Sequence, residues 1–306
     1  MRSASTFAAS EAEFGSSARG DADALSDRDF LIVDDDVRVL RERSAALRAE
    51  GLSVASYTFS KLEHLSRVGA LFVQHLRLEA NVSVDRDGRL GRLLAAFRPK
   101  SSYTAEIMDN GALAELIARI PPGPVAEMWA ADVLYVTMRN FGVLSLAERG
   151  RYVFAYDAIL DALREEGFLD KEAVANLRQL RFIKSLYRGD ATGSHGVVGL
   201  KVRSALAGLP RGYFPRVSSV VPAASVLSAP GPSESGSAYL LLRDLEKRLI
   251  AARLVGCDPD LDDGLVELVR WIRNPRAYAN LAAGLAPKFR ARLAAFQDRH
   301  LLSRAG

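Results

Sequence analysis

A short apolar run at residues 30–33, Phe-Leu-Ile-Val, is the feature that most constrains the fold of this chain. It directly follows Asp27-Arg28-Asp29 and stops at three consecutive aspartates, residues 34–36. Apolar runs of this length between polar residues are typical of buried strands. Because side chains alternate along a strand, Asp27 and Asp29 project from the same face. The sequence therefore predicts a strand that carries two carboxylates at its start.

A glycine–serine pair, Gly15-Ser16, precedes these carboxylates, with ten residues between Ser16 and Asp27. Gly15 has no side chain, so its backbone can approach a phosphate closely. Amides of the following turn and the Ser16 hydroxyl can donate hydrogen bonds to an anion, and Arg19 adds positive charge. A Gly-Ser pair alone occurs in many turns, and an Asp-x-Asp pair alone is usually a solvated turn or cap. Their conjunction favours a functional site.

The residue types in this conjunction suit one kind of chemistry. Two carboxylates on one face are the hard oxygen ligands that Mg²⁺ takes, with substrate phosphates completing its coordination. Nucleotidyl transfer needs such an ion and a grip on the triphosphate. We therefore predict that Asp27 and Asp29 are catalytic, metal-binding residues, and that Gly15, Ser16 and Arg19 bind the nucleotide.

Residues 14–33 resemble the signature of the DNA polymerase beta nucleotidyltransferase superfamily. They are closest to its small bacterial members, whose pattern is Gly-Ser, Arg and Gly, then Ser-Asp-x-Asp and a hydrophobic strand. A looser similarity in the order of elements extends to about residue 98. The resemblance implies a nucleotidyltransferase fold with a mixed sheet. It also implies Mg²⁺-dependent transfer of a nucleoside monophosphate from an NTP to a hydroxyl acceptor, which is a small molecule, a protein or an RNA end.

The family usually has a third carboxylate on the next strand, and here that position is not acidic. Residues 52–58 have strand-like composition, and Ser53 and Ala55 are the expected positions. The acids that could replace the missing carboxylate are Glu79, Asp85 and residues 34–36. Its absence supports an alternative function: a catalytically inactive nucleotide-binding or protein-interaction module, as in a toxin–antitoxin-like pair. Retention of two repelling carboxylates, Asp27 and Asp29, favours the enzyme.

The pattern along the chain predicts an α+β protein. We expect a nucleotidyltransferase domain at residues 1–98, a connecting helix and linker at 99–124, and an all-helical domain at 125–306 with a long loop at 208–237. In the first domain the spacing predicts helices at 37–50, 62–78 and 89–97, and a strand at 81–85. Beyond it, helices are expected at 104–120, 125–139, 146–166, 171–187, 238–254, 261–272 and from 275 onward.

The helical half resembles the HEPN-type domains that often accompany small nucleotidyltransferases. Their ribonuclease signature pairs an arginine and a polar residue with a later histidine. Here Arg273-Asn274 is present, but Tyr278 stands where the histidine is expected. We therefore predict that this half binds the acceptor or mediates dimerisation rather than cleaving RNA, and a homodimer is one expected assembly.

Composition narrows the remaining classes. Of the residues, 49% are hydrophobic and 25% charged, as in ordinary globular proteins, and the net charge of +4 does not by itself argue for nucleic acid. The single cysteine excludes an internal disulfide, and no two of the four histidines have metal-ligand spacing, so each is expected to pack or to face solvent. Charged residues interrupt the apolar stretch 125–146, which reads as a buried helix pair rather than a membrane span. These features predict a cytoplasmic location.

Overall fold

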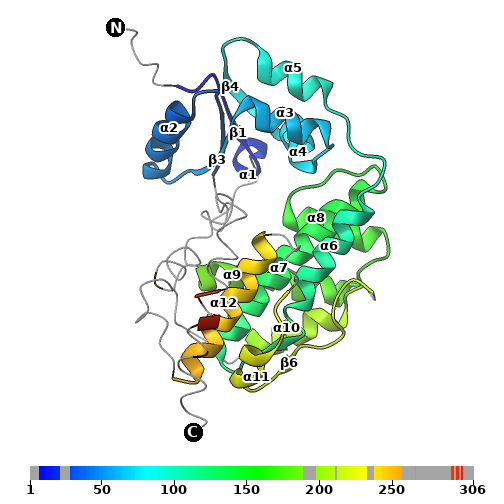
Figure 1. Ribbon diagram of the computed structural model, residues 1–306. Coiled ribbons are helices and arrows are strands. Elements are labelled where there is room, and N and C mark those ends of the chain that lie inside the picture. Colours follow the sequence, from blue (N-terminus) through cyan, green and yellow to red (C-terminus); the bar gives the residue numbers. More distant parts are fainter. Residues whose placement is uncertain are drawn as a thin grey trace. The chain divides into compact units, whose positions relative to one another are not determined.

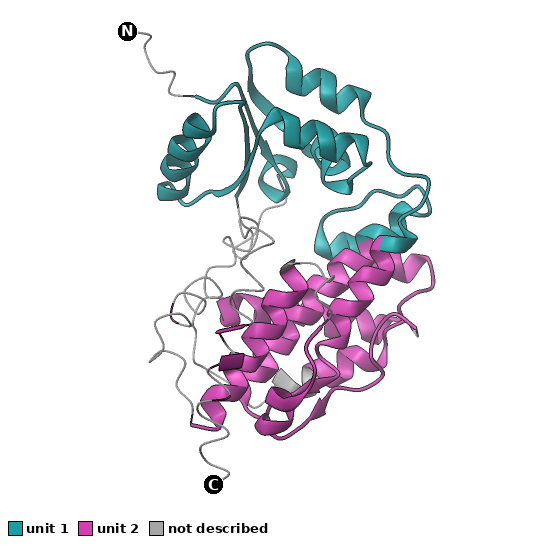
Figure 2. Ribbon diagram, viewed as in Figure 1, with its two compact units in different colours: residues 1–105, 143–159 teal, residues 106–142, 160–306 magenta. Residues whose placement is uncertain are grey.

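The computed structural model describes residues 7–20, 28–188, 198–210, 212–232 and 238–256, with short pieces at 266, 291–292, 294–295 and 298. The chain has two compact units (Figure 2). The first contains residues 1–105 and 143–159, and the second contains residues 106–142 and 160–306. Both helices and strands are present, so the α+β prediction is confirmed (Figure 1).

A four-stranded mixed sheet forms the centre of the first unit. Its strands are β1 (Ser10–Phe14), β2 (Asp29–Val33), β3 (Ser53–Tyr57) and β4 (Asn81–Asp85), in the order β3-β2-β1-β4. Strand β1 is antiparallel to β2 and β4, whereas β2 and β3 are parallel. The strands expected at 30–33, 52–58 and 81–85 are confirmed as β2, β3 and β4.

The sequence analysis did not predict β1, although β1 is one of the two central strands of the sheet. Its Ala12 and Phe14 are buried in the cluster that includes Leu31. The alternate residue Glu11 is only 2% exposed, and both its carboxylate oxygens accept hydrogen bonds of 2.9 Å from Arg43. Two glutamates hide the alternation of buried and exposed positions in this five-residue strand. The local sequence does not reveal that Glu11 is buried, because its partner Arg43 lies 32 residues away.

Helices cover both faces of the sheet, with α2 on one side and α3, α4 and α5 on the other (Figure 1). Helix α2 (Val37–Ala49) buries its apolar residues against Ile32 and Leu52. Helices α3 (Phe59–Arg67), α4 (Leu71–Glu79) and α5 (Arg89–Ala96) pack against the opposite face, which carries Leu31 and Val33.

One helix was expected at 62–78, and this prediction is wrong because α3 and α4 are separate. Gly69, between them, has φ 65°, which favours glycine. A Cβ at Gly69 would lie 2.9 Å from the backbone nitrogen of Lys100. The Tyr103 hydroxyl also donates to the Gly69 carbonyl, at 2.9 Å. The break is therefore set by a close approach of residues 100–103, which local helical spacing does not reveal.

The segment 143–159 belongs to the first unit, although it was expected in the second domain. Its Ala147 and Phe154 are buried with Leu71 of α4 and with Tyr103. The division at residues 98 and 124 therefore does not coincide with the compact units. Burial of its apolar residues against α4 places this segment in the first unit, although its position in the sequence suggested the second domain.

The second unit is mainly helical. Its elements include α9 (Lys171–Arg188), α10 (Val198–Ala207) and α12 (Ala238–Leu254), together with most of α6 (Thr104–Glu115), α7 (Pro124–Ala147) and α8 (Tyr156–Glu165). Helix α7 is continuous, so the helix pair expected at 125–146 is wrong. No helix in the described part of the chain combines the length and apolarity needed to cross a bilayer.

Two further corrections concern short elements. The predicted helix 104–120 ends at Glu115 and is followed by β5 (Arg119–Ile120), which pairs in parallel with β6 (Ser219–Val220). The region expected to be a loop at 208–237 thus contains β6 and the helix α11 (Ala223–Ser228), and this half is not all-helical. Two-residue strands have no detectable period and form only where a partner satisfies their backbone. The helices expected after residue 261 lie almost entirely outside the described residues.

Candidate functional site

The Gly-Ser pair forms a tight turn at the end of β1. Gly15 has φ 77° and ψ −151°, a conformation essentially restricted to glycine. It is followed by α1 (Ser16–Arg19), a single turn that ends at Gly20, which is in the left-handed helical conformation. The backbone therefore requires glycine at position 15, whatever else this residue does.

Asp29 lies directly against this turn. The antiparallel register places Asp29 opposite Phe14, the last residue before the turn. A Cβ added to Gly15 would be 3.0 Å from Oδ2 of Asp29. The structure thus brings together Gly15 and Asp29, which the sequence analysis assigned to one site. Asp27, the other predicted metal ligand, lies outside the described residues.

Ser53 is the neighbour of Asp29 on β3, and it is one of the two positions, Ser53 and Ala55, that the sequence analysis considered. The parallel register pairs Asp29 with Ser53 and Leu31 with Ala55. Side-chain alternation puts Asp29 on the same face as Leu31, the face covered by α3, α4 and α5. The position beside Asp29 therefore carries a hydroxyl where the resembled family has a third carboxylate.

The residues 34–36 and Asp85, which we considered as replacement acids, are at the wrong end of the sheet. Residue 34 is five residues along β2 from Asp29, which corresponds to about 16 Å at the usual rise per strand residue. Asp85 pairs with Ser10, at the opposite end of β1 from the Gly15 turn.

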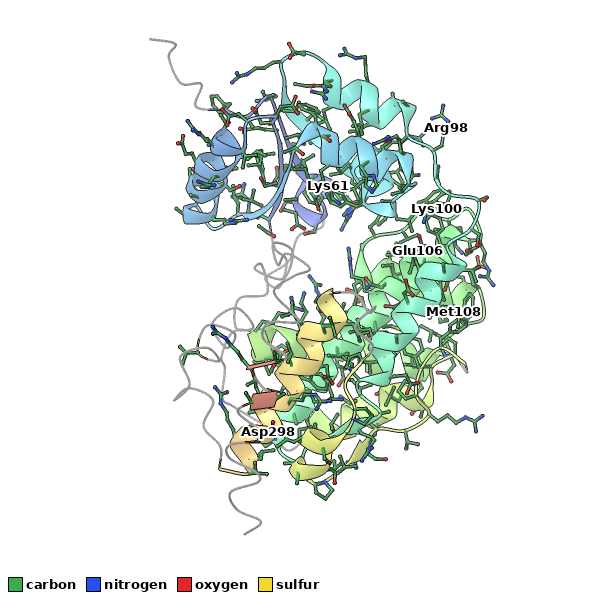
Figure 3. All side chains as sticks on the ribbon, in the orientation of Figure 1. Lys61, Arg98, Lys100, Glu106, Met108 and Asp298 are labelled. Atoms are coloured by element: carbon green, nitrogen blue, oxygen red, sulfur yellow. The ribbon has the colours of Figure 1, made fainter. Side chains whose placement is uncertain are left out.

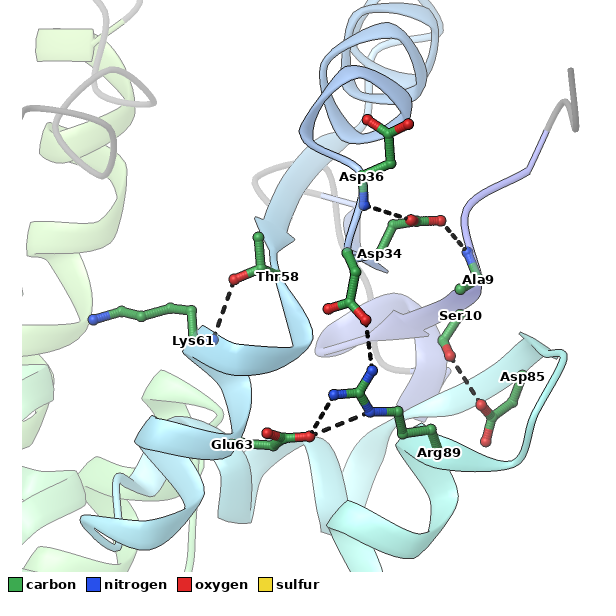
Figure 4. Close-up of polar contacts among 10 residues, drawn as sticks. Ala9, Ser10, Asp34, Asp36, Thr58, Lys61, Glu63, Asp85 and Arg89 are labelled. Carbon is green, nitrogen blue, oxygen red and sulfur yellow. Dashed lines mark hydrogen bonds and ion pairs between the residues drawn. The ribbon is translucent and has the colours of Figure 1, made fainter.

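These acids have structural partners instead, as Figure 4 shows. Asp34 accepts hydrogen bonds of 2.8 Å from the backbone amides of Ala9 and Asp36, and Asp36 caps α2. Arg89 joins Asp35 to Glu63, and Asp85 accepts from Ser10 and from the first turn of α5. Capping and ion pairing explain this acidic cluster, so it supplies nothing to Asp29.

Glu79, the third candidate, lies at the same end of the sheet as Gly15. It precedes Asn81, which pairs with Glu13 of β1. However, its Oε2 atom forms an ion pair with Arg19 and is 2.8 Å from Nε2 of His75. Burial would by itself raise the pKa of Glu79, but the hydrogen bond and charge of His75, together with Arg19, lower it below its ordinary value. Glu79 is therefore a carboxylate held ionised by Arg19 and His75.

His75 is buried among aromatic rings and hydrogen-bonds to Glu79. Its ring stacks on Phe154 at 4.3 Å with an interplanar angle of 19°, and meets Phe14 edge-on at 5.4 Å. The spacing of His75 and Glu79 on α4, four residues apart, was visible in the sequence. Their connection to Arg19 was not, because 60 residues separate Arg19 from Glu79.

The donors near the turn fit a magnesium ion only in part. Asp29 supplies a carboxylate and Ser53 a hydroxyl, and both are hard oxygen donors. The residues that the structure describes contain no group of three His, Cys, Asp or Glu side chains placed to hold a metal ion. Mg²⁺ is commonly held by one or two carboxylates plus substrate phosphates, and Asp29 supplies one such carboxylate beside the turn.

Of three exposed basic residues of the first unit, Arg98 and Lys100 lie close together on the segment after α5, whereas Lys61 lies on α3, so the three do not form one row (Figure 3). Nucleic-acid-binding proteins commonly line up basic side chains along a backbone-tracking surface. These three residues therefore give no support to an RNA acceptor.

A second charged cluster lies inside the second unit, and the sequence analysis used the charged residues of 125–146 only as evidence against a membrane span. The Asp132 carboxylate is fully buried and pairs with Arg188 and Arg243, at 2.9 and 3.0 Å. Glu246 pairs with Arg243 at 3.0 Å and accepts from Trp129. Burial raises the pKa of Glu246, although Arg243 opposes this. Two acids and two arginines balance in charge, which is the arrangement of an internal structural network.

Comparisons of the chain with protein-family models, with curated proteins and with solved structures gave no match. The structure itself defines an α+β protein in which a glycine turn lies against a carboxylate at one end of a mixed sheet.

Proposed function

We propose that the first unit is a nucleotidyltransferase that uses an NTP and Mg²⁺. The observation that carries this proposal is the contact of the Gly15 turn with the Asp29 carboxylate. A phosphate-binding turn and a metal-binding carboxylate must be neighbours if one triphosphate is to meet both. A serine after a glycine in that turn adds a hydroxyl donor.

In this proposal each residue has a separate role. Gly15 lets the backbone approach the triphosphate, and Ser16 and Arg19 donate hydrogen bonds to it. Asp29, with Asp27, would hold Mg²⁺, which when bound neutralises charge on the reacting phosphates. The acceptor is a hydroxyl compound of unidentified class, and the helical half presents it. A cytoplasmic location and a homodimer belong to the same proposal.

Two observations favour a second candidate, a nucleotide-binding module without catalysis. Ser53 lies beside Asp29, in the position where the resembled family has a carboxylate that binds metal or deprotonates the acceptor. Glu79, which was considered as a replacement acid, is paired with Arg19 and His75. These two observations support nucleotide binding without catalysis as the second candidate.

The test is release of pyrophosphate from labelled NTPs by the purified chain with Mg²⁺. An enzyme releases pyrophosphate with at least one of the four NTPs, and Asp29→Asn abolishes the release. A binding module binds an NTP but releases none, and Ser53→Asp then tests whether only the third carboxylate was lost. No binding and no release by wild type and Ser53→Asp would refute both functions.

A further inference from the structure

A continuous series of contacts leads from the 143–159 segment to the Gly15 turn. Phe154 stacks on His75, and His75 hydrogen-bonds to Glu79 one helical turn later on α4. Glu79 in turn pairs with Arg19, the last residue of α1. All of these residues belong to the first unit.

The hydrogen bond of His75 with Glu79 is partly buried, whereas the ion pair of Arg19 with Glu79 lies at the surface. The side chains of Arg19 and Glu79 are 26% and 12% exposed, and that of His75 is 11% exposed. Two aromatic rings contact the imidazole ring of His75: Phe154 stacks on it and Phe14 meets it edge-on. Phe14 is also the residue before Gly15, so His75 contacts the residue that leads into the turn.

The turn has Asp29 on one side and the Arg19–Glu79 ion pair on the other. Asp29 approaches from β2, and Glu79 lies just before β4, whose Asn81 pairs with β1. A guanidinium has five N–H donors, so an arginine can pair with a carboxylate and contact a phosphate at the same time. Holding a long side chain in one orientation before binding reduces the entropy lost on binding.

We propose that Glu79 and His75 are positioning residues that fix the Arg19 guanidinium beside the Gly15–Ser16 turn for contact with the triphosphate. This inference rests on the proposed function. It assigns Glu79 to nucleotide binding through Arg19, and not to the metal. It also gives the 143–159 segment a part in the site, because Phe154 supports His75.

A double-mutant cycle separates the positioning of Arg19 by Glu79 from the direct repulsion between Glu79 and phosphate. The affinity of an NTP in Mg²⁺ is measured by calorimetry for wild type, Arg19→Ala, Glu79→Gln and the double variant. Repulsion by Glu79 is removed equally in both backgrounds, so it cancels in the cycle. We expect Arg19→Ala to weaken binding roughly tenfold in the wild-type background and only about two- to threefold in Glu79→Gln.

His75→Phe provides a second variant that keeps the aromatic packing but removes the donor to Glu79. It should weaken binding roughly threefold in the wild-type background and leave the affinity of Arg19→Ala unchanged. A merely structural role would lower the melting temperature and affect both backgrounds alike. Glu63→Gln is the matched control, because it takes one carboxylate from Arg89 at the opposite end of the sheet and should not alter affinity.

The outcomes separate this inference from the function on which it depends. If wild type binds the NTP and the Arg19 and Glu79 effects are additive, the inference is wrong and the proposed function stands. If Arg19→Ala is more damaging in Glu79→Gln than in wild type, Glu79 sequesters Arg19 and the inference is also wrong. If wild type binds none of the four NTPs, the proposed function fails and takes the inference with it.

Discussion

Replacing Gly15 by alanine tests the contact on which the site assignment rests. Gly15 has φ 77° and ψ −151°, and forcing a residue with a side chain into such a conformation costs about 1–3 kcal/mol. The added Cβ would also lie 3.0 Å from Oδ2 of Asp29, which must move by a few tenths of an ångström. We expect a total loss of roughly 2–4 kcal/mol in the free energy of opening of β1 and β2.

A second substitution separates the steric cost at the Asp29 carboxylate from the conformational cost at Gly15. Asp29→Ala removes the carboxylate and keeps a Cβ, whose distance of 3.7 Å from the added atom is ordinary contact. Gly15→Ala should therefore cost about 1 kcal/mol less in the Asp29→Ala background, as expected for residues in contact. Amide hydrogen exchange of β1 and β2, measured on the full chain, reports the local free energy of opening.

Gly20 provides a control for positive φ without the contact. Its φ of 78° nearly equals that of Gly15, its ψ of 15° differs from the −151° of Gly15, and an added Cβ would meet nothing within 4 Å. Gly20→Ala should carry only the conformational cost and show no coupling to Asp29→Ala. Additive effects of Gly15→Ala and Asp29→Ala would refute the contact between the turn and the carboxylate. A loss of nucleotide binding in a Gly15 variant, taken alone, would not demonstrate a phosphate site, since the turn is strained in any case.

Three further predictions follow from other contacts. Arg43→Ala leaves the buried Glu11 without its guanidinium and should lower the free energy of unfolding by about 3 kcal/mol in urea denaturation. Burial of Asp85 raises its pKa, but hydrogen bonds from Gly91, Ser10 and Leu90 outweigh this and lower it. Ionised Asp85 therefore stabilises the folded state at pH values above the ordinary aspartate pKa, and this contribution is lost as the pH falls through and below about 4. Asp85→Asn should flatten the dependence of the free energy of unfolding on pH in this range. Ser53→Asp places a second carboxylate beside Asp29 and should reduce stability without Mg²⁺ but raise the affinity for Mg²⁺ in calorimetric titration.

Each of these has a result that would contradict it. Equal stability of Arg43→Ala and of the exposed-residue control Arg38→Ala would show that the Glu11 pair contributes nothing. An unchanged acid limb of the stability curve in Asp85→Asn would remove Asp85 as its source. If Ser53→Asp leaves both stability and Mg²⁺ affinity unchanged, Ser53 and Asp29 do not face the same space.

Local sequence patterns predicted most elements of the first unit, because the apolar residues of each element follow the spacing of a strand or of a helix. The apolar run of β2 and the strand-like composition of β3 identify these strands and their order. From them it follows that Ser53 or Ala55 lies near the carboxylates of β2, and the register in the structure places Ser53 beside Asp29. Strand β1 was missed because Glu11 and Glu13 occupy its alternate positions, and burial of Glu11 depends on Arg43 of α2.

The features that sequence could not reveal depend on distant partners. The helix break at Gly69 depends on Lys100, and the β5–β6 pair joins residues a hundred positions apart. The acids at 34–36 looked available to the site, but they cap α2, accept from Ala9 and pair with Arg89. In the site itself, motif spacing linked Gly15 to Asp29, whereas the link of Arg19 to Glu79 appears only once α4 is placed against the turn.

Calorimetric titration of the full chain with a non-hydrolysable NTP, with and without Mg²⁺, tests the central claim most directly. Wild type should bind the nucleotide in a Mg²⁺-dependent manner, and Asp29→Asn should lose this dependence. The control Asp87→Asn, an exposed aspartate in the turn after β4, should behave as wild type. Absence of nucleotide binding in wild type, or equal Mg²⁺-dependent affinity in wild type and Asp29→Asn, would contradict the account.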